Sequence, residues 1–226
     1  DITITHVADT GLNLKNANTG DDNPMVLTLQ TGDTDIAADD VLGTINFQAP
    51  DEGTGTDAIL VAAGISAISE GDFSSSSNAT KLVFKTGASA AADSKFEIAS
   101  DGSVSTPTAG TSNLRLGVNA GNSIASGGNF NVTVGDEAGT AITTGDSNTL
   151  VGYAAGDAIT TSGNNVAVGT SSMTTNILSA KNVALGVNAL KTHDQGTATE
   201  SFNVAVGHNA AESLTTGTEN TIIGGE

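Results

Sequence analysis

The sequence predicts an all-β protein in which a β-strand-rich N-terminal module precedes a parallel β-roll or β-solenoid with coils of about 17 residues. Three observations support this fold class. In the second half of the chain an asparagine stands four residues before a glycine seven times, and successive glycines are 18, 17, 17, 17, 21 and 17 residues apart. The residues between them are small or β-branched and lack an apolar stripe of helical spacing. The first half alternates apolar and polar residues between turn-forming stretches, as strands do.

Each repeat unit is defined by its asparagine and its glycine. The structural repeat residues are Asn113 and Gly117, Asn131 and Gly135, Asn148 and Gly152, Asn165 and Gly169, Asn182 and Gly186, Asn203 and Gly207, and Asn220 and Gly224. Helical repeats need about 30 residues or more, so a period this short indicates a solenoid. We therefore expect one β coil per unit over residues 113–226.

Three positions in each unit are expected to fill the interior of the coil. The residue before the glycine is always Leu, Val or Ile, and we predict that it points inward. A small residue follows three positions after the glycine, where two walls of a coil must approach closely. The apolar residues expected farther along the coils are Ile124, Ile142, Ile159, Ile177 and Leu214.

The repeated residue types suit a scaffold better than a catalytic site. Stacked asparagine amides can donate and accept hydrogen bonds from one coil to the next, as they do in fibrous β-structures. Glycine permits a positive φ and a close backbone approach. The sequence therefore predicts a ladder of asparagines along the solenoid axis and a recurring glycine corner.

Residues 1–100 form the predicted N-terminal module, and residues 101–112 form a predicted linker rich in Ser, Thr and Gly. Alternating apolar residues predict short strands that contain Ile2 and Ile4, Leu12 and Leu14, Met25, Leu27 and Leu29, Ile45 and Phe47, Leu82 and Phe84, and Phe96 and Ile98. The alanine-rich stretch 57–69 suits a helix in composition, but Gly64 and a period of two favour a strand.

The charge and composition bound the partners. The chain has 25 acidic and 7 basic residues, a formal net charge of −18 and no cysteine. We expect no nucleic-acid partner, because phosphate binding needs Lys and Arg, and no membrane span, because no apolar run reaches about 18 residues. Few aromatic residues are available for a single-chain core, which favours an oligomer. The chain starts without Met and stops just after the last motif glycine, so we expect it to be part of a longer protein and its repeat array to be incomplete at the C-terminus.

Two parts of the chain resemble known families. The N-terminal segments Val41–Phe47, Gly53–Ala58, Ile65–Gly71, Lys81–Thr86, Lys95–Ile98 and Asp101–Val104 resemble a module of phage tail fibre proteins. The units Asn165–Gly169 and Asn182–Leu190 are similar to repeats of fibre and adhesin proteins, in particular the left-handed β-roll heads of trimeric autotransporter adhesins. These resemblances imply a parallel homotrimer in a virion tail fibre, exposed outside the cell, with other virion tail proteins as partners. They also imply that a host receptor or glycan is contacted by a tip outside this chain.

Acidic clusters are the only metal candidates. Asp33, Asp35, Asp39 and Asp40 form one cluster, and Asp51, Glu52 and Asp57 form another. Their oxygen ligands favour a hard cation such as calcium, yet neither cluster matches the twelve-residue calcium loop. A solvated acidic loop explains both more simply, and we expect no cofactor.

Other polar residues give weaker hypotheses. His6, His193 and His208 are scattered and are interpreted as surface residues. Asp136 and Glu137 form the one adjacent acidic pair of the array, but neighbours in a strand point to opposite faces. The unit between Gly186 and Gly207 is four residues longer than most, and residues 191–197 are its predicted surface bulge.

The pattern favours a structural, non-enzymatic protein. The leading hypothesis is the shaft segment of a phage tail fibre, which spaces and presents a receptor-binding end for host attachment. The alternative is a bacterial trimeric surface adhesin head that binds host or matrix ligands along its flank. The second alternative is a fibre-borne polysaccharide depolymerase, which would need two carboxylates about 5 to 9 Å apart in a groove.

Overall fold

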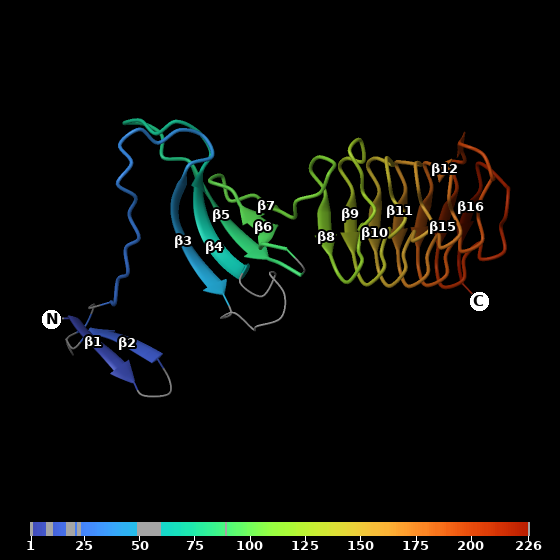
Figure 1. Cartoon of the computed structure of the whole chain (residues 1–226). Helices are drawn as coiled ribbons and strands as arrows, with labels where there is room; N and C mark the ends of the chain where they lie inside the picture. The colour runs from blue at the N-terminus through green and yellow to red at the C-terminus, as the bar shows by residue number, and fades with distance from the viewer. Residues whose placement is uncertain are drawn as a thin grey trace.

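The computed structural model describes residues 2–7, 11–16, 21, 24–48, 60–88 and 90–225. Throughout these residues the secondary structure is strand, turn and irregular chain without helix, which confirms the predicted all-β class. A hairpin comes first, formed by β1 (Ile2–Val7) and β2 (Gly11–Asn16). An antiparallel sheet and a parallel solenoid follow along the chain (Figure 1). No helix in the described part of the chain is long and apolar enough to cross a membrane.

The middle of the chain forms a five-stranded antiparallel sheet in the order β3-β4-β5-β6-β7. Its strands are β3 (Val41–Gln48), β4 (Val61–Ser69), β5 (Thr80–Thr86), β6 (Asp93–Ile98) and β7 (Val104–Ser105). The ambiguous stretch 57–69 is a strand from Val61 onward, as its period of two predicts, and residues 57–59 lie outside the described part. Strand β7 lies within the predicted linker 101–112 and pairs with β6.

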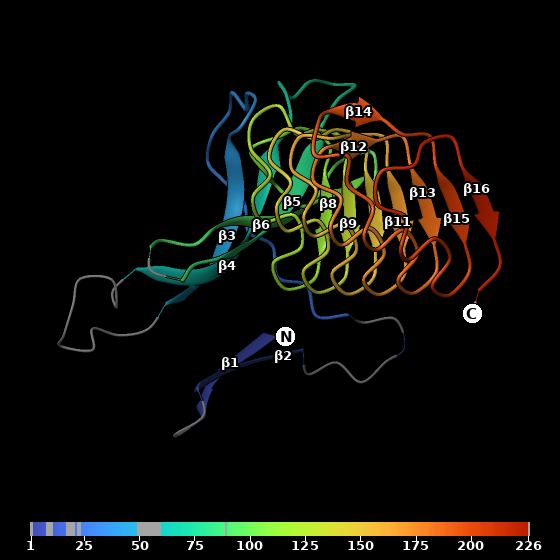
Figure 2. The same cartoon turned by 90° about the vertical axis from the view of Figure 1, so that its right-hand side faces the viewer.

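The C-terminal half is a parallel β-solenoid, as predicted from the 17-residue period. One short strand per coil contributes to a seven-stranded sheet whose spatial order follows the chain order (Figures 1 and 2). The strands are β8 (Leu114–Leu116), β9 (Val132–Val134), β10 (Thr149–Val151), β11 (Val166–Val168), β13 (Val183–Leu185), β15 (Val204–Val206) and β16 (Thr221–Ile223). All six pairings keep the Asn-x-x-x-Gly frame in register, for example Val166 opposite Val183. This register stacks equivalent residues of successive coils.

The prediction that the residue before the motif glycine points into the solenoid is wrong, because the alternation of inward and outward side chains along each strand is shifted by one residue. The residue before the glycine points outward: Val168 and Leu185 are 37% and 38% exposed, and Ile223 is 76% exposed. The buried residue is instead the middle one of the strand, such as Ala167 or Ala184. The physical reason is that the asparagine side chain is itself buried, and side chains two positions apart share a face. The buried asparagine thus determines the phase.

A second interior position compensates for the size of this middle residue. The residue four positions after the motif glycine is Gly156 where the strand residue is Leu150, and a Cβ on Gly156 would lie 2.8 Å from a Leu150 methyl carbon. Where the strand residue is Ala167, the compensating residue is Met173, which is fully buried. These two coils therefore fill a narrow core with alternative pairs of large and small side chains, whereas the coil of Ala205 has alanine at both positions, with Ala211 as the second.

This compensation predicts the outcome of a core swap. We expect Ala167→Leu to destabilise the protein by about 1–3 kcal/mol, because Leu overfills a coil that already contains Met173. We expect Met173→Gly to cost about 2–5 kcal/mol through the cavity that it leaves. The double variant should recover much of both losses because it reproduces the Leu150 and Gly156 pair. Urea unfolding followed by circular dichroism checks this, and a double variant no more stable than the weaker single variant would contradict it.

One predicted strand has no counterpart. Met25, Leu27 and Leu29 lie in an extended segment, but residues 24–30 belong to no sheet. Their side chains are 40%, 63% and 48% exposed. An alternating pattern becomes a strand only where another strand supplies hydrogen-bond partners, and the described residues of this chain supply none here.

Candidate functional site

The repeated asparagines form a continuous buried stack through the solenoid. In most coils the backbone N–H and the side-chain Nδ2 of the asparagine both donate to the Oδ1 of the asparagine one coil before. Asn203 is the exception, because only its backbone N–H donates to Asn182 Oδ1, at 3.1 Å, while its Nδ2 donates to the carbonyl of Gly217. For Asn148 on Asn131 both distances are 3.0 Å, and for Asn165 on Asn148 they are 3.1 and 3.2 Å. Asn182 continues the stack at 3.0 and 3.3 Å. The structure thus brings the predicted repeat asparagines together in one ladder.

Each amide of the ladder also bonds within the protein wall. Asn148 Nδ2 donates to the carbonyl of Ser162 at 3.0 Å, and Asn165 Nδ2 donates to that of Ser179 at 3.1 Å. These asparagines are fully buried, and a buried amide is costly unless it is hydrogen-bonded. Because each side chain bonds to both neighbouring coils, the ladder fixes the coil-to-coil register.

The motif glycines form a corner that requires glycine. Gly169 has φ +136°, and a Cβ built on it would lie 2.4 Å from the carbonyl oxygen of Gly186 in the next coil. A side chain would therefore force the coils apart. A second left-handed position, which the sequence did not reveal, lies just before each asparagine. It is occupied by non-glycine residues in every coil, for example Asn164 at φ +59° and Phe202 at φ +51°.

His193 corrects the prediction of a surface histidine. Its side chain is fully buried at the seventh position after the motif glycine, where Ile142 and Ile159 fill other coils. Nε2 lies 3.3 Å from Nδ2 of Asn203, whereas Nδ1 has no hydrogen-bond partner. The same position in the preceding coil is the buried Asn176, and the predicted inward residue Ile177 is 41% exposed. If the repeat units are aligned on the motif glycine rather than on their apolar residues, His193 and Asn176 fall at the same interior position as Ile142 and Ile159.

Burial gives His193 a pH-dependent effect on stability. Desolvation lowers the pKa of His193 from its ordinary 6.5, opposed by the backbone of Thr215 and by the charge of Asp194. The unfolded chain therefore binds this proton more readily, so the free energy of unfolding should fall as the pH drops below about 6.5. Thermal unfolding measured from about pH 7.5 to about pH 5 checks this. His193→Leu should remove that part of the pH dependence, whereas His208→Leu, at an exposed position, should retain it.

The long unit places its insertion later than predicted. His193 still occupies its regular interior position, so the four extra residues lie between His193 and Asn203 rather than across 191–197. β14 (Thr199–Glu200) lies in this stretch and pairs in parallel with β12 (Ser179–Ala180) of the preceding coil. Because β12 belongs to a unit of regular length and Ser179 is fully buried, β14 continues the wall of the solenoid.

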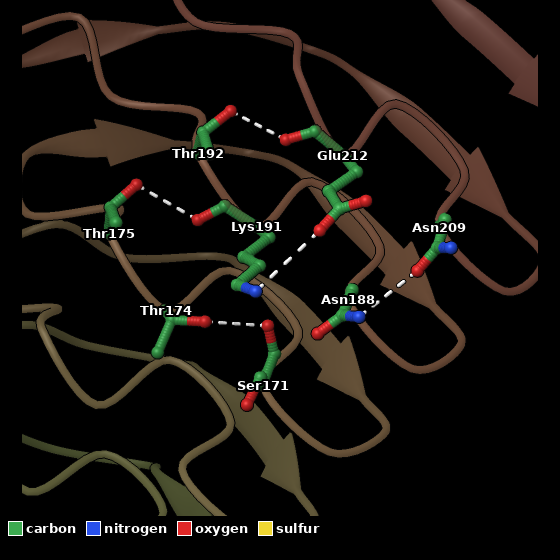
Figure 3. Close-up of polar contacts among 8 residues, drawn as sticks. All are labelled: Ser171, Thr174, Thr175, Asn188, Lys191, Thr192, Asn209 and Glu212. Atoms are coloured by element: carbon green, nitrogen blue, oxygen red, sulfur yellow. Dashed lines mark hydrogen bonds and ion pairs between the residues drawn. The ribbon is translucent and has the colours of Figure 1, made fainter.

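Polar side chains also link coils along an outer edge (Figure 3). Thr175 Oγ1 donates to the carbonyl of Lys191 at 2.9 Å, and Thr192 Oγ1 donates to that of Glu212 at 2.5 Å. Lys191 Nζ lies 3.6 Å from a Glu212 carboxylate oxygen. Half-exposed ion pairs add little stability, so these contacts align the coils more than they strengthen them.

The acidic candidates are not arranged as a metal site. Asp33 Oδ1 accepts the backbone N–H of Asp35 at 3.0 Å, and Asp40 Oδ2 accepts that of Ala37 at 2.7 Å. Asp39 has φ +70°, in keeping with a turn. Across the described residues no group of three or more His, Asp or Glu side chains is placed to hold a metal ion. The second cluster, Asp51, Glu52 and Asp57, lies outside the described residues.

The other titratable candidates are also separate. Asp136 is exposed and its neighbour Glu137 is half-buried with φ +60°. Burial raises the pKa of Asp157 one coil away, opposed by hydrogen bonds from the backbone of Ala158 and of Asp157 itself, and the charge of Glu137 makes a smaller contribution in the same direction as burial. Two hollows of about 560 and 600 Å³ contain one carboxylate each, from Asp93 and Glu212. His208 is exposed, and the side chain of His6 in β1 lies outside what the structure describes.

Comparison with known proteins gives no relative. No family model, no curated protein and no solved structure matches the chain. The class of protein is therefore defined by its architecture alone, a repeat protein with a parallel β-solenoid.

Proposed function

We propose that this chain is a structural shaft segment of a phage tail fibre, a stiff spacer that presents a receptor-binding end for host attachment. The observation that carries the proposal is the buried asparagine ladder. It uses the most regular residues of the chain to hold coils together rather than to form a pocket. Seven stacked strands extend about 30 Å at the usual strand spacing. A rod of this kind transmits position and force along the axis of a fibre.

A parallel homotrimer is the assembly that we propose for this shaft. The outward residues of the solenoid strands support self-association, because this row is apolar in a chain with a net charge of −18. The row before the glycines consists of Leu116, Val134, Val151, Val168, Leu185, Val206 and Ile223. Identical chains around an axis could bury these rows against one another. The shaft would lie in the virion, outside the cell, and contact other virion tail proteins, without enzymatic activity.

The second candidate is a bacterial trimeric surface adhesin head. Exposed aromatic side chains on the solenoid favour it: Phe130, Tyr153 and Phe202 are 61%, 55% and 48% exposed. Aromatic rings of this exposure are typical anchors for a protein or glycan ligand. Replacing all three with Ser should abolish binding to a host-cell or matrix surface if the flank is the ligand site. A shaft would retain its assembly and shape.

Light scattering combined with small-angle X-ray scattering tests the shaft proposal. We expect a particle with three times the 22.2 kDa mass of the chain and an elongated scattering profile. A compact monomer would contradict both the spacer function and the trimer. An elongated monomer would contradict the trimer alone.

A further inference from the structure

The five-stranded sheet has one apolar face. Directly paired residues lie on the same face, and Ile45, Ile65, Phe84 and Phe96 form one row across β3 to β6. The adjacent row is Gly43, Ala67, Leu82, Ile98 and Val104. Neither row contains a charged residue. Phe84 and Phe96 contact each other edge to face, with ring centroids 5.8 Å apart.

The opposite face of the same sheet is mostly polar, although it also contains Ile68 and the buried Val83. Lys81 Nζ lies 3.7 Å from a carboxylate oxygen of Glu97, and the hydroxyls of Thr44 and Ser66 are 3.1 Å apart. A polar face of this kind suits water, whereas the apolar face needs a cover. That face remains open: Ile45 is 44% exposed, Phe47 55% and Leu82 38%. The sheet is therefore half of a two-layer structure.

The segment 24–30 has the complementary properties of a cover. Its sequence Pro-Met-Val-Leu-Thr-Leu-Gln has no charge, and its backbone makes no strand pairing within the described chain. Met25, Leu27 and Leu29 alternate, so an extended segment presents them on one side and Val26 and Thr28 on the other. Leu29 already lies against the sheet, since a Cβ on Gly43 would be 3.1 Å from the Leu29 Cβ.

We propose that residues 24–30 form an exchanged arm, which lays Met25 and Leu27 on the apolar face of the β3–β7 sheet of a second copy of this chain. This inference rests on the proposed oligomeric shaft and identifies where its copies meet. Within one chain Leu29 lies against Gly43, whereas Val26 and Leu27 before it are 65% and 63% exposed.

The areas are of the right order for such an exchange. Five strands of about six residues present a face of roughly 24 by 20 Å, or about 450 Å². A seven-residue arm about 24 Å long and, with its side chains, about 10 Å wide covers roughly 240 Å² of that face. Each copy both gives an arm and receives one, so about 500 Å² is buried per copy, the greater part of the ~800 Å² of a standard interface. The absence of charge from the two rows and from the arm removes the repulsion that acidic chains would otherwise feel at this contact.

Cysteine cross-linking tests the arm directly, because the natural sequence has no cysteine. Leu27→Cys with one affinity tag and Phe47→Cys with another are co-expressed, and the purified protein is treated with a short bismaleimide. We expect a covalent dimer that contains both tags. The matched control is Thr28→Cys with Phe47→Cys, where the thiol lies on the other side of the arm and should cross-link at least tenfold less.

Three outcomes would overturn the proposal. They are equal cross-linking by the Thr28 control, no two-tag product, and, in a separate variant that carries both cysteines on one chain, cross-linking only within that chain. Scattering on the untreated protein separates this failure from failure of the proposed function. An elongated trimer without the Leu27 cross-link would leave the shaft standing and reject the arm. A compact monomer would reject both.

Discussion

Gly169→Ala should cost more than about 4 kcal/mol of stability and disrupt the coils around it, the largest effect that we expect from a single methyl group. The added Cβ would lie 2.4 Å from the carbonyl oxygen of Gly186 and 2.5 Å from its carbonyl carbon. Both are backbone atoms held by the parallel sheet, so neither can move without separating two coils. Urea unfolding followed by far-ultraviolet circular dichroism measures the loss.

Gly224→Ala is the matched control, because Gly224 has nearly the same backbone conformation in open surroundings. Its φ is +134°, against +136° for Gly169, and nothing lies within 4 Å of its added Cβ. We expect only the cost of the unusual φ, about 1–3 kcal/mol. The difference between the two variants then measures the contact between coils. Equal losses would show that backbone conformation, and not the close approach of coils, explains the repeated glycine.

The repeat made the solenoid predictable because two residue types report two separate requirements. Asn165 and its equivalents supply an amide that bonds to both neighbouring coils, and Gly169 and its equivalents permit contact between backbones. Each requirement recurs once per coil, so its period appears directly in the sequence. The number and parallel order of the strands follow from that period.

The strand phase and the interior of the long unit were not predictable in the same way. Apolarity assigned the residue before the glycine to the core, but the buried amide of Asn165 reverses that phase and places Ala167 inside. A narrow coil accepts small, polar and apolar residues at equivalent interior positions, so His193 and Asn176 resemble surface residues in the sequence. The residue type at a position therefore indicates whether it is buried only in a wider core, from which polar side chains are excluded.

The N-terminal module shows a different limit. Alternation correctly predicts β4 and β5, whose neighbours lie in the same chain. The same alternation at Met25 and Leu27 predicts an extended segment but cannot specify which strand or surface receives it. The amphipathic pattern of the sheet is local, whereas the cover that we propose for its apolar face comes from a second copy of the chain.

Asn165→Ala should destabilise the solenoid by about 3 kcal/mol or more, because it breaks the ladder in the middle of the stack. The backbone N–H of Asn182, which donates to Asn165 Oδ1 at 3.0 Å, and the carbonyl of Ser179, which accepts from Nδ2 at 3.1 Å, would both lose a partner in the buried interior. Asn122→Ala, at an exposed asparagine, is the control and should cost less than about 0.5 kcal/mol. Similar losses for both variants would mean that the ladder does not hold the coils together.

Asn165→Asp distinguishes hydrogen bonding from packing at the same position. The carboxylate keeps the shape of the amide and accepts from Asn182, but it cannot donate to Asn148 or to the carbonyl of Ser179. Burial raises the pKa of such a carboxyl group, and so does the position of its second oxygen, which would face the acceptor oxygens of Asn148 and Ser179. The folded state therefore favours the protonated form of the carboxyl group. Stability of this variant should therefore increase as the pH falls through the range where Asp becomes protonated, relative to the parent protein. A variant whose deficit is independent of pH would show that the site tolerates the charge, and that close packing rather than the ladder of donors selects asparagine.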